Sequence, residues 1–309
     1  MDKIVTILQC IAPIFVAVVL GILARRKELM TQDDIQGLQQ FVMKFALPCV
    51  LFNSCLGANI STETISTFAL VVPFMVIATL WSFRYGRKRF PYHNLPMLFA
   101  AQETGMLGIP LYMLLFGAAE AYRIGVLDVA QMLTAFPTIA ILTANAGENP
   151  SKKDLVKNVL RSPLVIMSAL GLALNFSGIA AWMGKLGVLG ILTESTAFLA
   201  QPVSALMIFC VGYNLSLEKG SRKAIFQVSA LHLGWTVAFG LVIQLVLLLI
   251  PNVDAMTRWA VLMYTTLPAC YLAPSLGPNK EDFAMASGVC SILTLISLAV
   301  FCVMAVIVA

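Results

Sequence analysis

The chain has 309 residues, of which 60% are apolar and 11% are charged, and its mean hydropathy is +0.89. So few charges cannot cover the surface of a soluble domain of this length, so the composition excludes a soluble protein and predicts an integral membrane protein. The formal net charge of +5 comes without a basic patch interleaved with aromatic residues, so it does not indicate nucleic-acid binding.

Apolar runs recur along the chain, and each is close to the roughly 20 residues that a helix needs to cross the hydrocarbon core. The sequence therefore predicts an all-α membrane protein with ten transmembrane helices. The runs start near Ile4, Ile35, Ile65, Leu95, Tyr122, Ser162, Leu186, Ala224, Trp259 and Asp282. The first run lacks an Ala-x-Ala cleavage pattern, which favours a transmembrane helix over a signal peptide.

Lysine and arginine are distributed unevenly between the loops. The loops after the odd-numbered spans carry fifteen of them, the opposite side carries four, and Lys44 falls inside the second span. Because positively charged loops stay in the cytoplasm, this bias predicts a multi-pass protein of the inner (plasma) membrane. Both termini are expected on the non-cytoplasmic side.

The two halves of the chain share a pattern of prolines and glycines. Pro13 and Gly21 in the first span are eight residues apart, as are Pro163 and Gly171 in the sixth. The second and seventh spans carry Pro48 and Pro202, the fourth span is interrupted at GMLGIP, and the ninth is interrupted around Pro268 and Pro274. We therefore predict two five-helix repeats, residues 1–150 and 151–309, and the odd number of spans per repeat inverts the second.

Proline and glycine inside a membrane helix free backbone polar groups, which lipid does not satisfy. Such breaks are tolerated where they are buried in protein or line a polar cavity. Two crossing breaks bring half-helix N-termini to one point, and this point favours an anion. Interrupted spans at corresponding places in two halves indicate a transporter binding site near the midplane.

The stretch QETGMLGIP places a carboxylate, Glu103, inside the fourth span. A lone buried carboxylate is costly unless it is protonated, paired or bound to an ion. Asp128 and Gln131 lie three apart on the fifth span and share a helical face. Asp128 is either functional or a packing group near the outer interface.

Several other polar residues have two interpretations. Lys44 is either a counter-ion for a site carboxylate or a snorkelling side chain, and Asn53 is either a site amide or a helix-helix contact. Thr265, Thr266 and Tyr271 flank the ninth-span break and are candidates to line a cavity. His232 is more typical of a packing histidine than of a proton relay.

The chain resembles the auxin efflux carrier family of secondary transporters, in a bacterial-type form. The matching segments are KFALPCVLFNS, ETGMLGIPLYMLLFG, LAQPVSALMIFCVGYNLS, TLPACYLAP and ASGVCSILTLIS. The resemblance implies a scaffold made from spans 1, 2, 6 and 7 and a transport unit made from spans 3–5 and 8–10 that slides as an elevator. It also implies a small organic anion as substrate, auxin- or malate-like, and a homodimer that forms through the scaffold helices.

The candidate residues follow from the breaks and the resemblance together. Those for substrate binding are Gln102, Glu103, Thr104, Gly105, Gly108, Pro110, Gln131, Thr265, Thr266, Pro268, Tyr271, Lys44 and Asn53. Those for ion or proton coupling are Glu103 and Asp128. No cysteine or histidine spacing is typical of a metal site, and no cofactor is expected.

Family members often carry asparagine where this chain has Glu103. A carboxyl group there predicts that a proton, rather than sodium, is moved together with the anion, because ionised Glu103 would repel it. Three alternatives stay open: a sodium-coupled carrier, a membrane-embedded enzyme that uses Glu103 and Asp128, and a channel or sensor. The sequence has no P-loop, H-E-x-x-H or G-x-S-x-G motif, which disfavours ATP hydrolysis and an enzyme.

Overall fold

A computed structural model describes residues 2–58, 62–144, 160–215, 222–250 and 253–308, and nearly all of these residues are helical. The first half contains α1 (Asp2–Arg26), α2 (Gln32–Phe41), η1 (Val42–Ala46), α3 (Leu47–Leu56), α4 (Thr62–Trp81), η2 (Ser82–Gly86), α5 (Arg87–Arg89), α6 (Leu95–Ala100), η3 (Thr104–Gly108), α7 (Ile109–Phe116), η4 (Ala118–Glu120) and α8 (Ala121–Ala144). The second half contains α10 (Pro163–Ser177), α11 (Ile179–Lys185), α12 (Val188–Ala200), α13 (Val203–Asn214), α14 (Arg222–Leu249), α15 (Ala255–Thr266), η5 (Ala273–Leu276) and α16 (Lys280–Val308).

Helices begin close to all ten predicted starts. The largest offset is at α15, which begins at Ala255 rather than near Trp259, because Asp254 caps it and accepts a hydrogen bond from the Met256 N–H at 2.9 Å. Among the described residues, six helices are long and apolar enough to cross a membrane, or seven if one bent pair is counted as a single span. The prediction of an all-α, multi-pass membrane protein is thus confirmed.

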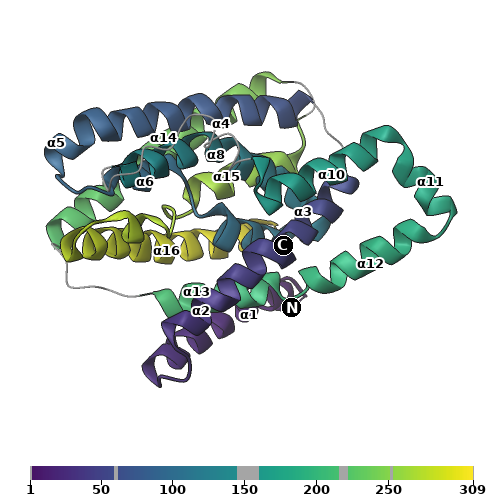
Figure 1. Cartoon of the computed structure of the whole chain (residues 1–309), viewed down its shortest axis with the longest axis horizontal. Coiled ribbons are helices and arrows are strands. Elements are labelled where there is room, and N and C mark those ends of the chain that lie inside the picture. The colour runs from purple at the N-terminus through teal and green to yellow at the C-terminus, as the bar shows by residue number, and fades with distance from the viewer. Residues whose placement is uncertain (1, 59–61, 145–159, 216–221, 251–252, 309) are drawn as a thin grey trace.

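The sixth predicted run is not one straight helix. It forms α10 and α11, whose axes differ by 78°. The two helices meet at Gly178, which has φ +73°, a left-handed conformation that ends a helix and that glycine adopts without strain. In Figure 1, α10, α11 and α12 project together on the right, away from α4, α14, α8 and α16.

The ninth run is interrupted around Pro268, and the fourth is interrupted at residues 101–103. The predicted position of the fourth-run break, GMLGIP, is wrong, because these residues are helical as parts of η3 and α7. The fourth consists of α6, the non-helical residues 101–103, the π-helix η3 and α7. The ninth consists of α15, a non-helical segment at residues 267–272 and the four-residue 3-10 helix η5. The part of the ninth run after its break is short, because Gly277 follows η5 directly and Pro278 cannot continue a helix.

Two helix pairs pack with their backbones in direct contact. A Cβ atom on Gly21 of α1 would lie 2.2 Å from the Phe209 carbonyl oxygen of α13. A Cβ atom on Gly171 of α10 would lie 2.6 Å from the Phe52 carbonyl oxygen of α3. Glycine is required at both crossings because any side chain would push the helices apart. These are the two glycines that follow Pro13 and Pro163 at equal spacing.

Candidate functional site

The two interrupted runs meet as a short antiparallel pair. Gln102 and Ala269 form an isolated antiparallel bridge. The Glu103 N–H donates to the Pro268 carbonyl at 2.8 Å, and the Cys270 N–H donates to the Ala101 carbonyl at 3.1 Å. Each break therefore satisfies backbone groups that the other exposes and that lipid could not satisfy.

The opposite edge of the first break is hydrogen-bonded to a side chain. The Gln102 N–H donates to Oε1 of Gln131 at 2.8 Å, and Nε2 of Gln131 donates to the Gln102 carbonyl at 3.0 Å. The amide of Gln131 thus pairs with Gln102 as a neighbouring strand would. Gln131 is 5% exposed and lies on α8, so this pairing fixes α8 against the first break.

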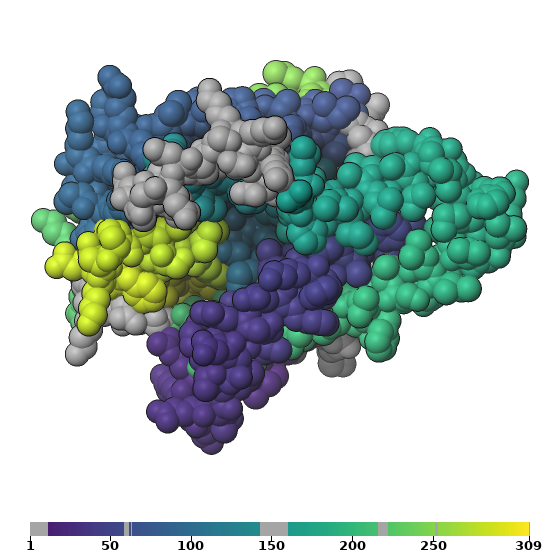
Figure 2. Space-filling model, in the orientation of Figure 1, coloured from purple at the N-terminus to yellow at the C-terminus, as the bar shows by residue number. Residues whose placement is uncertain are grey.

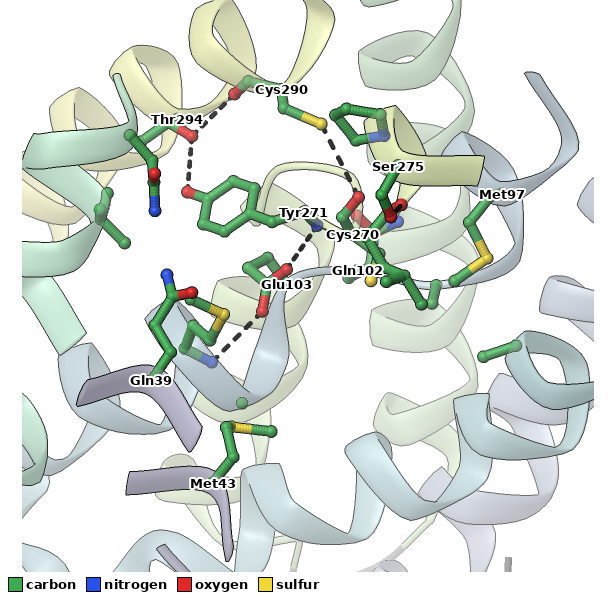
Figure 3. Close-up of a pocket in the computed structure, with 18 of the residues that line it drawn as sticks. Gln39, Met43, Met97, Gln102, Glu103, Cys270, Tyr271, Ser275, Cys290 and Thr294 are labelled. Atoms are coloured by element: carbon green, nitrogen blue, oxygen red, sulfur yellow. Dashed lines mark hydrogen bonds between the residues drawn. The ribbon is translucent and has the colours of Figure 1, made fainter. Parts of the chain in front are cut away.

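The carboxylate of Glu103 accepts a backbone hydrogen bond from each break. Its Oε1 accepts from the Met106 N–H at 3.3 Å, and its Oε2 accepts from the Tyr271 N–H at 2.6 Å. Glu103 is also the N-cap of η3, where the first N–H groups of a helix lack intrahelical acceptors. Figure 3 shows the carboxylate between the two donors. These bonds offset part of the cost of burying a side chain that is 6% exposed.

A second buried carboxylate, Asp128, lines the same cavity as Glu103, at the crossing where the two breaks pair. Its Oδ1 accepts from Nε2 of Gln131 at 2.8 Å. The same nitrogen lies 3.1 Å from Oγ1 of Thr104, and Oε1 of Gln131 also accepts from the Tyr264 hydroxyl at 2.9 Å. Asp128 is 5% exposed. The network therefore connects Asp128 of α8, through Gln131, to both interrupted runs.

The side chain of Gln102 points to the other side, toward α14. Its amide lies against the carbonyls of Leu267 and Pro268 and against Nε2 of His232, at 3.1 to 3.2 Å. All three are acceptors when His232 is neutral with its proton on Nδ1, so the amide nitrogen rather than the oxygen faces them. His232 is fully buried, and this contact is that of a packing and orienting histidine.

A cavity of about 730 Å³ reaches the crossing from one face of the molecule. Its inner end is formed by Glu103, Asp128 and Tyr271, and its outer end by residues of α1, α2 and α13 such as Arg25, Gln32 and Asn214. In Figure 2 the surface is hollowed between the purple residues of α2 and α3 and the yellow residues of α16. The two carboxylates are therefore buried in protein yet adjoin a space that a small molecule can enter.

The wall between the two ends is apolar and rich in sulfur. Met43, Met97 and Met132 line it together with Cys270 and Cys290. Such side chains are polarizable and adapt to irregular shapes. Arg25 is the only lysine or arginine among the described lining residues, and its guanidinium lies at the outer end, 3.5 Å from the carbonyl oxygens of Tyr213 and Leu215. Among the described residues, no three His, Cys, Asp or Glu side chains are grouped to hold a metal ion.

The cavity brings together about half of the candidate residues. Those that line it are Gln102, Glu103, Gly105, Asp128, Gln131 and Tyr271. Two further candidates contact lining residues: the Thr104 hydroxyl lies next to the Gln131 amide, and the Pro268 carbonyl accepts from the Glu103 N–H. Gly108 packs against Leu267, and the Pro110 carbonyl accepts from the Ser204 hydroxyl at 3.3 Å. Thr265 and Thr266 donate to carbonyls of their own helix, at Leu262 and Met263.

Lys44 and Asn53 lie elsewhere. Lys44 is exposed, and its Nζ donates to Oε1 of Gln40 at 3.2 Å, one turn earlier on the same face. Lys44 is not among the described lining residues, and it forms no ion pair with either buried carboxylate in the described part of the chain. Asn53 accepts from the Thr196 hydroxyl at 2.7 Å and donates to the Thr193 carbonyl at 3.4 Å, which makes it a contact between α3 and α12.

Sequence reasoning missed three parts of this site. The backbone N–H of Met106 carries no residue-type signal. Thr294, whose hydroxyl lies 2.7 Å from that of Tyr271, is one turn beyond Cys290 and was detectable only as a polar residue in an apolar run. Three glutamines of α2 line the cavity, and their i, i+4, i+7 spacing was a usable signal of one polar face. They are Gln32, Gln36 and Gln39.

Apolar helices of membrane-spanning length, together with a cavity that ends at buried polar groups, are the features of a multi-pass membrane transporter. A family model described as "Membrane transport protein" matches residues 6–306. The chain therefore belongs to this family, which includes the auxin efflux carriers and consists of transporters rather than enzymes. Its environment is a lipid bilayer and its substrate a small molecule. No curated protein matches the chain.

Proposed function

We propose that the protein is a secondary active transporter of a small organic anion, a mono- or dicarboxylate, and that a proton moves with the substrate. One observation carries the proposal: a cavity ends where two interrupted helices pair with each other beside two buried carboxylates. Backbone donors of both breaks converge at this point, which is the arrangement that binds anionic groups in transporters.

The proposal includes ten spans arranged as two inverted repeats, residues 1–150 and 151–309. Two relationships support it. The α1–α13 and α10–α3 crossings both depend on a glycine, and these two glycines correspond between the halves. The two breaks also pair reciprocally, since each donates one backbone hydrogen bond to the other. Reciprocal contacts of this kind are expected across a two-fold axis in the membrane plane.

We further propose that α4–α8 and α14–α16 slide as one unit against a scaffold of α1–α3 and α10–α13. The hydrogen bonds within the unit support this, because the crossing joins α8, α14 and α15 to both breaks. Hydrogen bonds between the unit and the scaffold include those from the Ser54 and Ser204 hydroxyls to the carbonyls of Ala119 and Pro110. Exposed apolar side chains on α1, such as Phe15 and Leu20, leave room for lipid or for a second copy in a homodimer.

The positive charge on the loops supports an inward-facing state in the plasma membrane. The cavity opens beside Arg25 and Gln32, which flank the loop with Arg26 and Lys27. If the basic loops are cytoplasmic, the cavity opens to the cytoplasm and both termini lie outside.

Proteoliposomes test the proposal directly. Wild-type protein should take up carboxylates such as malate or indole-3-acetate against a gradient when a proton gradient is imposed, and a sodium gradient should not replace it. Glu103→Gln should lose concentrative uptake but keep substrate counterflow. Glu194→Gln is the matched control, because Glu194 is exposed on α12 and is not among the described residues that line the cavity. Full uptake driven by a proton gradient in Glu103→Gln would show that Glu103 does not couple proton and substrate movement. Flux at channel rates would contradict the proposal of a carrier.

A further inference from the structure

The inner end of the cavity already holds a carboxylate, and that carboxylate belongs to the protein. Glu103 accepts from the Met106 N–H with one oxygen and from the Tyr271 N–H with the other. The donors lie 165 residues apart, one in each interrupted run, and they face a common point (Figure 3). Two N–H groups directed at the two oxygens of one carboxylate form a charge-assisted, bidentate arrangement.

The surroundings leave this pair of donors as the main attraction for an anion at the inner end. The titratable groups that face Glu103 are Asp128 from α8, Cys270 and Tyr271 from the second break, and Cys290 from α16. The scaffold contributes Met43 and Gln39, which are uncharged. The guanidinium of Arg25 is at the far end of the cavity and bonds to backbone carbonyls. No basic side chain from the described residues thus lines the inner end.

We propose that ionised Glu103 is the resident ligand of a carboxylate-binding site formed by the N–H groups of Met106 and Tyr271. An external carboxylate binds there only when Glu103 is protonated and moves off the donors. This inference rests on the proposed function and specifies how its site works. Proton binding and substrate binding are then coupled by mutual exclusion, because the Glu103 carboxylate and the external carboxylate compete for the same pair of donors. Like charges within a few ångströms in a poorly hydrated site also repel each other strongly.

The exclusion fixes the number of protons that bind with each carboxylate. Each carboxylate that binds to the wild-type protein requires one proton from the cavity water on Glu103, and each that leaves allows one proton to depart. Above the pH at which Glu103 ionises, the binding-competent fraction falls tenfold per pH unit, so the apparent dissociation constant rises tenfold per unit. Removal of the tethered carboxylate abolishes this dependence, because the donors are then free at every pH.

Acetate is a sufficient probe, because the proposed site recognises only the carboxylate group. In purified Glu103→Ala protein, acetate should raise the thermal unfolding midpoint relative to chloride at equal ionic strength, by the same amount at pH 6 and pH 8. In the wild-type protein, the acetate effect should be present at pH 6 and at least tenfold weaker in apparent affinity at pH 8.

Asp128→Asn is the matched control. It removes a carboxylate from the same cavity but leaves Glu103 on its two donors. Its acetate response should still weaken tenfold per pH unit, as in the wild-type protein, once Glu103 is ionised. A response in Asp128→Asn that is as independent of pH as in Glu103→Ala would overturn the proposal, since it would show that general negative charge, and not occupancy of the donors, controls binding.

A measurement on the wild-type protein keeps the test decisive if Glu103→Ala does not fold. Acetate added to weakly buffered protein at pH 8 should cause the uptake of about one proton per acetate bound, and Glu103→Gln should show none. Acetate binding without proton uptake overturns the exclusion. The exclusion proposal and the proposed function can fail separately. Acetate could bind without proton uptake while proton-driven transport persists, or the exclusion could hold while the transport assay shows another driving ion.

Discussion

Gln131 and Gln102 exchange two hydrogen bonds, in which the side-chain amide of one pairs with both backbone polar groups of the other at 2.8 and 3.0 Å. The non-helical residues of the fourth run are thereby paired on both edges, by Pro268 and Cys270 on one side and by this amide on the other. A single side chain on α8 thus completes the hydrogen bonding of a helix break.

Gln131→Leu should therefore destabilise the protein severely. The change leaves the N–H and the carbonyl of Gln102 buried without these partners, at a cost of about 1–3 kcal/mol for each group. We expect a clear drop in the thermal unfolding midpoint and loss of substrate counterflow. Gln40→Leu is the control, since Gln40 is exposed on α2 and should change the midpoint little. Equal midpoints for the two variants would show that the Gln131 amide does not hold the break.

Gly21→Ala and Gly171→Ala should both loosen the scaffold. A methyl group at either residue overlaps a backbone carbonyl of the partner helix, which must shift because backbone cannot rotate out of the way. Overpacking costs about 1–3 kcal/mol, so both unfolding midpoints should fall.

Gly190→Ala supplies the comparison for these two variants. Gly190 lies inside α12 with open space around its Cα, so alanine there should leave the midpoint unchanged or raise it slightly. A fall for only one of Gly21→Ala and Gly171→Ala would contradict the equivalence of the two crossings.

Lys44→Ala should leave transport nearly unchanged. The Lys44 ammonium is exposed and bonds to Gln40 on its own helix, and such surface contacts contribute little. We expect the substrate KM and the pH dependence of uptake to stay within about twofold of wild type, the scale of the small free energies of surface contacts. An increase in KM of tenfold or more would instead place Lys44 near the substrate in another conformation of the transport cycle.

Asn53→Ala should separate stability from substrate recognition. The Asn53 side chain joins α3 to Thr193 and Thr196 of α12, and its removal leaves the Thr196 hydroxyl without one partner. A cost of about 1 kcal/mol is expected, seen as a lower unfolding midpoint. Uptake measured at a temperature where the variant is folded should show a wild-type KM, and a changed KM would mean that Asn53 reaches the substrate.

The positions of the helices could be predicted from the sequence because they depend on local chemistry, and the interruptions could be predicted only in part. The length of the apolar runs predicted the start of α6 at Leu95, and proline predicted the break at Pro268. The break of the fourth run lies at residues 101–103, before the glycines and proline of GMLGIP, which are helical. The bend at Gly178 was missed, since a glycine near a helix end does not by itself specify a change of direction.

The contacts within the site could be predicted only in part. Glu103 and Asp128 stood out because carboxylates are rare in membrane spans. The pairing of Gln131 with Gln102 was not foreseeable, because it depends on how α8 is placed against a segment 29 residues away. For Lys44 the sequence left a counter-ion and a snorkelling side chain both open, because charge and depth along a span do not determine which face of the helix carries the residue.

The antiparallel bridge between Gln102 and Ala269 also constrains how the protein is made. The first half of the chain enters the membrane long before the ribosome has translated residues 267–271. During this interval the N–H of Glu103 and the carbonyl of Ala101 have no partners from the second break, and unsatisfied backbone in lipid is costly. We therefore expect the fourth run to reach its final depth late, once the ninth has been inserted, so that a nascent chain stalled before Trp259 does not yet bind substrate.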